Sequence, residues 1–174
     1  PLVEQAGRRW RATFMGSERT VDASEIAGLE AEIAFNGFYP YRCSPEEATQ
    51  LSADPAYRAG VFTRLMRRTA EDWVAMADAR LVGSGVECFV MPGNDDESFL
   101  DEVLAQSTTI KNHDGAIIEV AGYRIVGHGW SNPTPWHTPR EKSDDEIERD
   151  LEALLAAAMP LGPIIFNPHV PPYG

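Results

Sequence analysis

The sequence predicts an α/β fold, in which short strands alternate with amphipathic helices. Two apolar runs of strand length, 86–91 and 164–166, each end in a turn rich in Pro or Gly and then present polar side chains. Between the strand-like segments lie stretches whose apolar residues recur every three to four positions, as they do on one face of a helix. This alternation is typical of a sheet flanked by helices.

The N-terminal half predicts a hairpin followed by helices. Polar and apolar residues alternate over 9–16, and a turn at 16–18 leads into a second strand. Asp22 and Glu25 form a capping-box pattern for a helix that ends at Asn36-Gly37, and Ser44-Pro45 and Asp54-Pro55 begin two more. The last of these carries a stripe expected to face the core: Val61, Leu65, Met66, Trp73, Met76 and Leu81. Between the first two helices, Phe38-Tyr39-Pro40-Tyr41 favours a packed aromatic loop over a substrate platform.

The C-terminal half predicts alternating strands and helices. Buried strands are expected at 87–91 and 164–166, with an acidic helix through Phe99 to Leu104 after the first. Three short strands follow at 108–110, 115–120 and 123–126, and Ser143 with Glu146 caps another helix. The stretch 127–140 contains three prolines and no periodicity, so it predicts a long loop, which in a compact domain is often functional.

Composition narrows the class of function. The net charge of −12 argues against a basic groove for nucleic acid, although a site with bound cations could still take a phosphorylated substrate. No apolar run is long enough to span a membrane. Cys43 and Cys88 lack metal-site or redox spacing, which favours a reduced, cytoplasmic setting. The chain starts without Met and ends in a loop-like segment, which predicts a fragment of a longer protein.

The candidate metal ligands follow the two apolar strands. Asn94, Asp95 and Asp96 come directly after the first strand, and His169 follows the second. Because ligands of open α/β sheets bind at the carboxyl ends of strands, these side chains are expected to meet. Amide, carboxylate and imidazole donors suit Mn, Fe, Zn or Ni. Each segment alone also fits a structural interpretation, in which the first is a turn with an Asp helix cap and His169 merely orders a loop.

The other histidines are weaker candidates. His128 ends a strand and could face the same cleft, His113 lies in a polar turn and is expected to be solvated, and His137 is ambiguous within the proline loop. The chain has neither a Gly-x-Ser-x-Gly nucleophile elbow nor a Walker loop.

Two of these segments resemble motifs of the calcineurin-like metallophosphoesterases. That family carries, in order, Asp-x-His, Gly-Asp, Gly-Asn-His-Asp/Glu, a lone His and Gly-His-x-His. Gly93-Asn94-Asp95-Asp96 resembles the third block, and Asn167-Pro168-His169, with Pro171-Pro172 after it, resembles the fourth. The loop from Gly129 to Glu141 is similar to one that a prokaryotic branch places between these blocks.

The resemblance implies a fold, a cofactor and site roles. It covers 86–174 most specifically, with 1–85 as a hairpin and helical segment, so that 1–174 would be one partial domain of a four-layer α/β/β/α sandwich. Asn94 and His169 would ligate one of two divalent ions in a phosphoester hydrolase. Asp95, where the family has His, would stand near the leaving group and Asp96 would orient or cap. His128 or Arg140 would contact the phosphate of a small-molecule substrate.

The same resemblance leaves the chain incomplete. The first, second and fifth blocks are absent, so a bimetal centre would need residues outside these 174. Sheets cut in this way would expose unpaired edges, so the chain is expected either to be marginally stable alone or to pair with a second copy of itself. The alternative function is a non-catalytic α/β binding or structural module.

Overall fold

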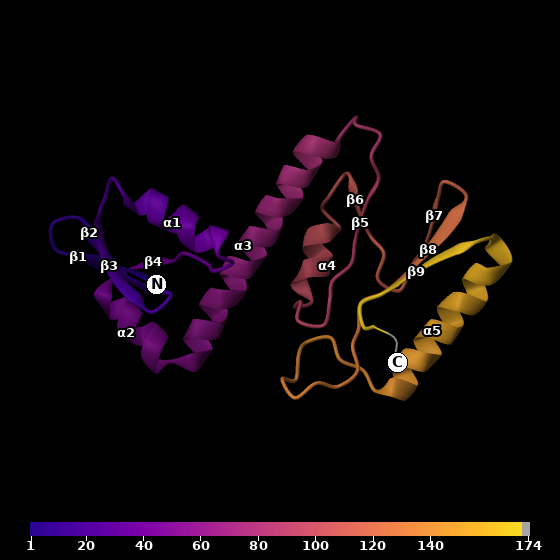
Figure 1. Cartoon of the computed structure of the whole chain (residues 1–174). Coiled ribbons are helices and arrows are strands. Elements are labelled where there is room, and N and C mark those ends of the chain that lie inside the picture. The colour runs from indigo at the N-terminus through magenta and orange to yellow at the C-terminus, as the bar shows by residue number, and fades with distance from the viewer. Residues whose placement is uncertain (172–174) are drawn as a thin grey trace. The chain divides into compact units, whose positions relative to one another are not determined.

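A computed structural model describes residues 1–171, and Pro172 of the proposed Pro-Pro pair lies outside them. The chain is mixed α/β and divides into two compact units, Pro1–Arg68 and Thr69–Gly174 (Figure 1). The long helix α3 (Pro55–Leu81) contributes residues to both units. None of the helices within 1–171 is long and apolar enough to cross a membrane.

The first unit is a four-stranded sheet packed against helices. Its strands are β1 (Leu2–Gln5), β2 (Arg9–Phe14), β3 (Ser17–Asp22) and β4 (Arg42–Cys43), in the order β3-β2-β1-β4. Its helices are α1 (Ile26–Phe35), α2 (Pro45–Ala53) and the start of α3. The predicted hairpin is confirmed as β2 and β3, whereas β1 and β4 carry too short a pattern to have been predicted.

The helix starts of this unit follow local hydrogen bonding. Ser44 accepts from the amide of Glu47 and caps α2 as predicted. The expected start of α1 at Asp22 is wrong, because α1 begins at Ile26. The Asp22 amide still donates to the Glu25 carboxylate at 3.1 Å, so half of the capping box forms in the turn before the helix.

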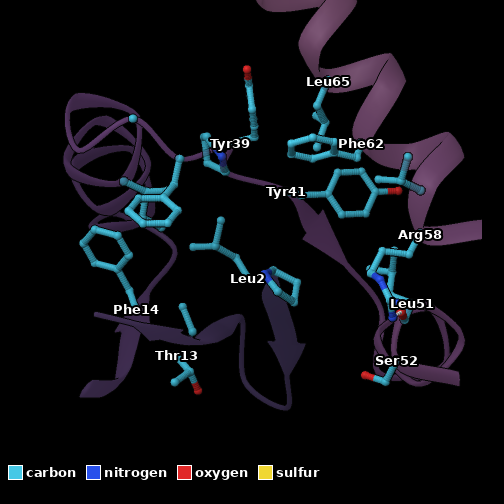
Figure 2. A pocket seen from close by; sticks show the side chains of 17 residues that line it. Leu2, Thr13, Phe14, Tyr39, Tyr41, Leu51, Ser52, Arg58, Phe62 and Leu65 are labelled. Atoms are coloured by element: carbon cyan, nitrogen blue, oxygen red, sulfur yellow. Dashed lines mark hydrogen bonds between the residues drawn. The ribbon is translucent and has the colours of Figure 1, made fainter. Parts of the chain in front are cut away.

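One core cluster of the first unit lies between the sheet and α1, and a pocket opens beside it. Six residues form the core cluster: Leu2, Ala12, Phe14, Ile26, Leu29 and Ile33. The pocket, of about 690 Å³, has aromatic walls (Figure 2). Phe14 meets Phe38 edge to face, and Tyr39 meets Phe62 in the same way. The predicted aromatic loop thus contributes to a pocket wall, with Phe38 56% exposed.

The second unit contains two separate small sheets. In the first, β5 (Cys88–Val90) pairs in parallel with β6 (Ile110–Asn112). In the second, β8 (Tyr123–His128) pairs antiparallel with β7 (Ile117–Val120) and parallel with β9 (Ile164–Pro168). The helices are α4 (Phe99–Leu104) and α5 (Asp144–Ala158), followed by the short 3-10 helix η1 (Met159–Leu161). The strand predicted at 108–110 lies two residues later, at β6.

Apolar packing attaches α3 to α4, and one carboxylate attaches it to the segment between α4 and β6. Val74 packs with Val103 and Leu104 of α4. Asp78 accepts from the hydroxyls of Ser107 and Thr109, each at 2.6 Å. These bonds hold the pKa of Asp78 well below its usual range.

Two burial expectations are wrong. Trp73 and Met76 of the predicted α3 stripe are 64% and 43% exposed, because Val74 instead faces the core. The strands expected to be buried are not: β5 is only half-buried, and Ile165 and Phe166 of β9 are 46% and 43% exposed. The reason is position, since β9 lies at the edge of its sheet.

Candidate metal centre

The ends of four strands converge at one place in the second unit. Parallel pairing brings together the carboxyl ends of β5 and β6, and likewise those of β8 and β9. The two pairs are joined by the Asp114 carboxylate, which follows β6 and accepts from the amide of Gly129, which follows β8, at 2.7 Å. Within the second pair, the His169 amide donates to the carbonyl of His128, the last residue of β8, at 2.8 Å.

The structure places Asn94 and His169 in direct contact. Asn94 Oδ1 lies 2.8 Å from His169 Nε2, although the two residues are 75 positions apart and follow strands of different sheets. Asn94 is half-buried and His169 exposed, so the pair is open to solvent on one side. Side chains more than about 10 Å apart could not share an ion whose ligand distances are about 2 Å, and these two side chains are not separated in that way.

Gly93 makes this contact sterically feasible. A Cβ built at Gly93 would lie 2.7 Å from Cε1 and 2.9 Å from Nε2 of His169. Carbon atoms in van der Waals contact are about 3.5–4.0 Å apart, so any side chain here would displace the imidazole ring. The expected role of Gly93, close approach of the backbone to the site, therefore has a steric basis.

The two aspartates that follow Asn94 occupy different environments. Asp96 Oδ2 accepts from the Gly93 amide at 2.7 Å, and its own amide donates to the Gly93 carbonyl at 3.2 Å. Asp96 thus closes the turn that carries Asn94. It is not the cap of α4, which begins only at Phe99. Asp95 is exposed, so its carboxylate faces solvent beside the pair.

The loop after β8 reaches the pair through Thr138. Asn94 Nδ2 donates to Thr138 Oγ1 at 3.1 Å, and the Thr138 hydroxyl donates to Glu141 Oε1 at 2.7 Å. The same carboxylate oxygen accepts from the Thr134 hydroxyl and from the Thr138 amide. These bonds, led by that of Thr134, lower the pKa of Glu141 to about 2.

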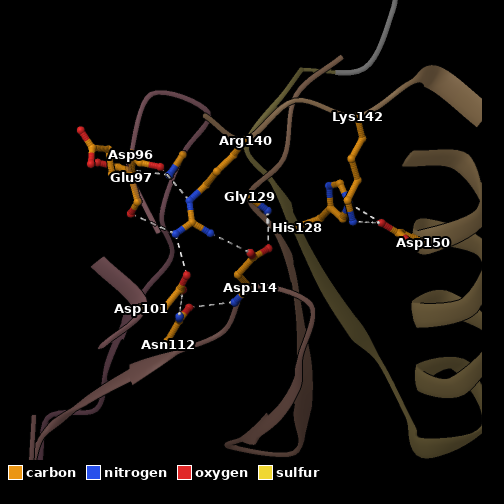
Figure 3. A network of polar contacts seen from close by, with 11 residues as sticks. Asp96, Glu97, Asp101, Asn112, Asp114, His128, Gly129, Arg140, Lys142 and Asp150 are labelled. Carbon is orange, nitrogen blue, oxygen red and sulfur yellow. Dashed lines mark hydrogen bonds and ion pairs between the residues drawn. The ribbon is translucent and has the colours of Figure 1, made fainter. Parts of the chain in front are cut away.

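Arg140 anchors the loop beneath the site (Figure 3). Its side chain is buried and donates to the carbonyls of Asp96 and Glu97 and to the Asp101 carboxylate, at 2.9, 3.3 and 2.6 Å. Its amide donates to the Asn94 carbonyl at 3.0 Å. A phosphate contact, as the resemblance implied, would require Arg140 to leave these partners, so we assign it to holding the loop.

His128 is likewise buried rather than presented to the cleft. Its ring is 2% exposed, and Nε2 lies 3.5 Å from the Asp150 carboxylate of α5 (Figure 3). Lys142 donates to the same carboxylate at 2.6 Å, and this bond is the main reason why the pKa of Asp150 is lowered. Direct contact of His128 with a substrate would need this packing to open.

Of the two remaining histidines, one is buried and one is exposed. The expectation that His113 is solvated is wrong: it is 3% exposed, and its Nε2 lies 2.9 Å from Nδ2 of Asn167. A Cβ at Gly127 would lie 2.3 Å from the His113 carbonyl, which shows how closely the strand ends pack. His137 is exposed at the loop surface with a positive φ of 52°.

Sequence reasoning missed Thr138 and Glu141 as individual residues. Only the loop that contains them was singled out, by its length and prolines. Within residues 1–171, no group of three or more His, Cys, Asp or Glu is placed to hold a metal ion. At the strand ends, the described part of the chain brings together two possible donors, the amide oxygen of Asn94 and an imidazole nitrogen of His169.

Comparison with known proteins gives a partial match and no family. No protein-family description matches the chain, and no solved structure matches it. The chain is 33% identical over 89 residues to an uncharacterized protein of Methanocaldococcus jannaschii, MJ1162. The match covers 51% of this chain and 38% of the length of that protein.

Proposed function

We propose that this chain contributes part of a bimetal centre that hydrolyses phosphoesters, in a longer protein of the calcineurin-like type. One observation carries the proposal: an amide oxygen and an imidazole nitrogen from the ends of two strands lie 2.8 Å apart. The resemblance of the surrounding residues to two motifs of that family supports the assignment of these donors to a metal.

The separation of the two donors fits adjacent ligands of one ion. Ligands about 2.1 Å from an ion in octahedral geometry lie roughly 3.0 Å apart when adjacent. The observed 2.8 Å is close to this separation, and Gly93 leaves the imidazole unobstructed. An ion bound here would take the place of the proton that Nε2 donates to Asn94 Oδ1, with the neutral imidazole then protonated at Nδ1. Amide and imidazole donors suit Mn, Fe, Zn or Ni.

The proposal gives each residue at the site a separate role. Asn94 and His169 bind one ion, and Asp96 holds the turn that carries Asn94. Asp95 faces solvent beside the pair, where it would lie near the leaving group of a phosphorylated small molecule. A bimetal centre supplies a water of lowered pKa and stabilises the charge that develops on the phosphoryl group.

The four-layer sandwich is the fold proposed for the whole protein. The second unit has two separate sheets, one of them mixed, with α4 and α5. Apolar side chains are exposed on β9 at the edge of its sheet, as they would be if further elements covered it in the complete fold.

A non-catalytic binding or structural role is the second candidate. It is favoured by the two-donor site within residues 1–171, because two ligands give far weaker affinity than a closed site. Calorimetry of this chain with Mn²⁺ addresses it: weak binding that Asn94→Ala abolishes fits a partial centre, and no binding at all favours the structural role.

The catalytic proposal is tested with the longer protein, Mn²⁺ and a chromogenic phosphodiester. Asn94→Ala and His169→Ala should each lower kcat/KM at least a hundredfold. Asn132→Ala and His137→Ala remove the same groups from exposed positions of the loop and serve as matched controls. Unchanged turnover in the first two variants would refute the proposal.

A further inference from the structure

We propose that Thr138 and Glu141 are positioning residues that fix the orientation of the Asn94 amide, so that its oxygen rather than its nitrogen faces His169. The importance of this orientation for metal binding rests on the proposed function. The orientation itself follows from the donors and acceptors of four side chains, and it can be tested without a metal.

The carboxylate of Glu141 can only accept hydrogen bonds. Its Oε1 receives the Thr134 hydroxyl at 2.6 Å, the Thr138 amide at 2.8 Å and the Thr138 hydroxyl at 2.7 Å. With the pKa of Glu141 lowered to about 2, the group is an ionised carboxylate at neutral pH and has no proton to donate.

The direction of the Thr138 hydroxyl proton determines which atom of the Asn94 amide faces Thr138. A threonine hydroxyl has one proton, and here that proton is directed to Glu141. Thr138 Oγ1 therefore has only a lone pair to offer to the Asn94 amide, 3.1 Å away. The amide must turn its NH₂ to Thr138, because the opposite orientation would set two oxygens against each other with no proton between them.

This orientation of the amide determines which atom faces His169. With Nδ2 held by Thr138, Oδ1 lies toward His169 Nε2 at 2.8 Å. Oxygen has the lone pairs that a cation needs, whereas an amide NH₂ offers only donors. Without such a network the two orientations of an asparagine amide are nearly equivalent in shape, so the network decides whether Asn94 can act as a ligand.

Backbone hydrogen bonds hold the loop that carries Thr138 and Glu141 against Asn94. The amide of Arg140, between Thr138 and Glu141, donates to the Asn94 carbonyl. The amide of Ser131 donates to the Arg140 carbonyl at 3.1 Å, and the Lys142 amide donates to the Ser131 carbonyl at 2.8 Å. The two ends of the loop are thus tied together, and the Thr138 hydroxyl is held against Asn94.

The test uses the 174-residue chain with and without Mn²⁺. Without metal, nuclear Overhauser effects should connect the Asn94 amide protons to the Thr138 side chain and not to the His169 ring. In Thr138→Val, which keeps the shape but loses the hydroxyl, contacts between these protons and the His169 ring should grow. With Mn²⁺, paramagnetic broadening of Asn94 and His169 signals measures affinity, which should fall at least tenfold in Thr138→Val.

Two variants control for structural effects. Thr138→Ser keeps the hydroxyl and should bind Mn²⁺ within about threefold of the native chain. Thr134→Val removes a hydroxyl that reaches the same Glu141 oxygen but does not contact Asn94, and it should also bind nearly normally.

The outcomes separate this inference from the proposed function. Amide protons next to His169 in the native chain, or Mn²⁺ affinity equal to native in Thr138→Val, would overturn the positioning role. Affinity as low in Thr138→Ser as in Thr138→Val would also overturn it. The expected Overhauser pattern without any Mn²⁺ broadening at Asn94 or His169 would instead uphold the orientation and reject the metal assignment.

Discussion

Replacing Gly93 by Ala should disable the candidate site while leaving the fold almost unchanged. The added Cβ would lie 2.7 Å from Cε1 of His169, against an ordinary contact limit near 3.4 Å. The ring must therefore retreat by about 0.7 Å, which exceeds the roughly 0.5 Å within which a functional constellation has to be held. From 2.8 Å, such a retreat takes His169 Nε2 to the limit of hydrogen bonding with Asn94.

The cost in stability should be small because His169 can yield. The residue is exposed, so its ring can swing into solvent, and Gly93 does not have a positive φ that alanine would strain. The loss is one solvent-accessible hydrogen bond, about 1 kcal/mol of unfolding free energy. For a chain of this size that lowers Tm by roughly 2–4 °C.

Gly129→Ala provides the contrasting control. A Cβ there would lie 2.1 Å from the Pro92 carbonyl oxygen, which belongs to the backbone and cannot swing away. Overpacking of this kind costs roughly 1–3 kcal/mol and occasionally more, so Gly129→Ala should lower the free energy of unfolding more than Gly93→Ala does.

The assay combines urea unfolding with Mn²⁺ titration followed by paramagnetic broadening of the His169 signals. Gly93→Ala should keep a near-native unfolding midpoint and lose at least tenfold in Mn²⁺ affinity. Native affinity in Gly93→Ala would show that the contact between His169 and Asn94 is not what binds the ion. A collapse of stability equal to that of Gly129→Ala would show that Gly93 is structural.

Two further predictions concern the residues that hold the loop. Arg140→Met should lower the free energy of unfolding by roughly 2–4 kcal/mol in urea, because it removes a buried guanidinium that donates to the carbonyls of Asp96 and Glu97 and pairs with the Asp101 carboxylate. Arg140→Lys should not restore it, since an ammonium cannot span these partners. An equal midpoint for native and Arg140→Met chains would contradict this. Glu141, whose folded pKa of about 2 lies below its ordinary 4.5, stabilises the fold fully above pH 4.5 and loses that contribution as pH falls toward 2. Glu141→Gln should therefore flatten this part of the acid-unfolding curve, and an unaltered slope between pH 4.5 and 2 would count against the carboxylate network.

The sequence predicts elements well where the signal is local. Ser44-Pro45 and Asp54-Pro55 mark the starts of α2 and α3, because a side-chain oxygen and a proline suffice to begin a helix. Ala121-Gly122 similarly marks the turn between β7 and β8, where both residues adopt positive φ. Signals of this kind depend on a few neighbouring residues and little on the tertiary structure of the rest of the chain.

Burial was predicted less well because it depends on position in the sheet. Ile164-Ile165-Phe166 has the composition of a strand covered on both faces, yet β9 lies at an edge and exposes two of these side chains. A strand's composition describes the surroundings to which it is suited, whereas its neighbours are decided by long-range pairing that no local pattern reveals.

The candidate site shows the same division between local and long-range information. That Asn94 and His169 follow strand ends is local information. Their strands belong to different sheets, however, so their contact depends on the long-range placement of β5 and β9. The hydroxyl of Thr138 carries no such signal, because it matters only through its place between Asn94 and Glu141. A candidate ligand can thus be recognised from its position along the chain. The group that orients it becomes visible only when the direction of each proton in the hydrogen-bond network can be assigned, and here an ionised Glu141 sets that direction.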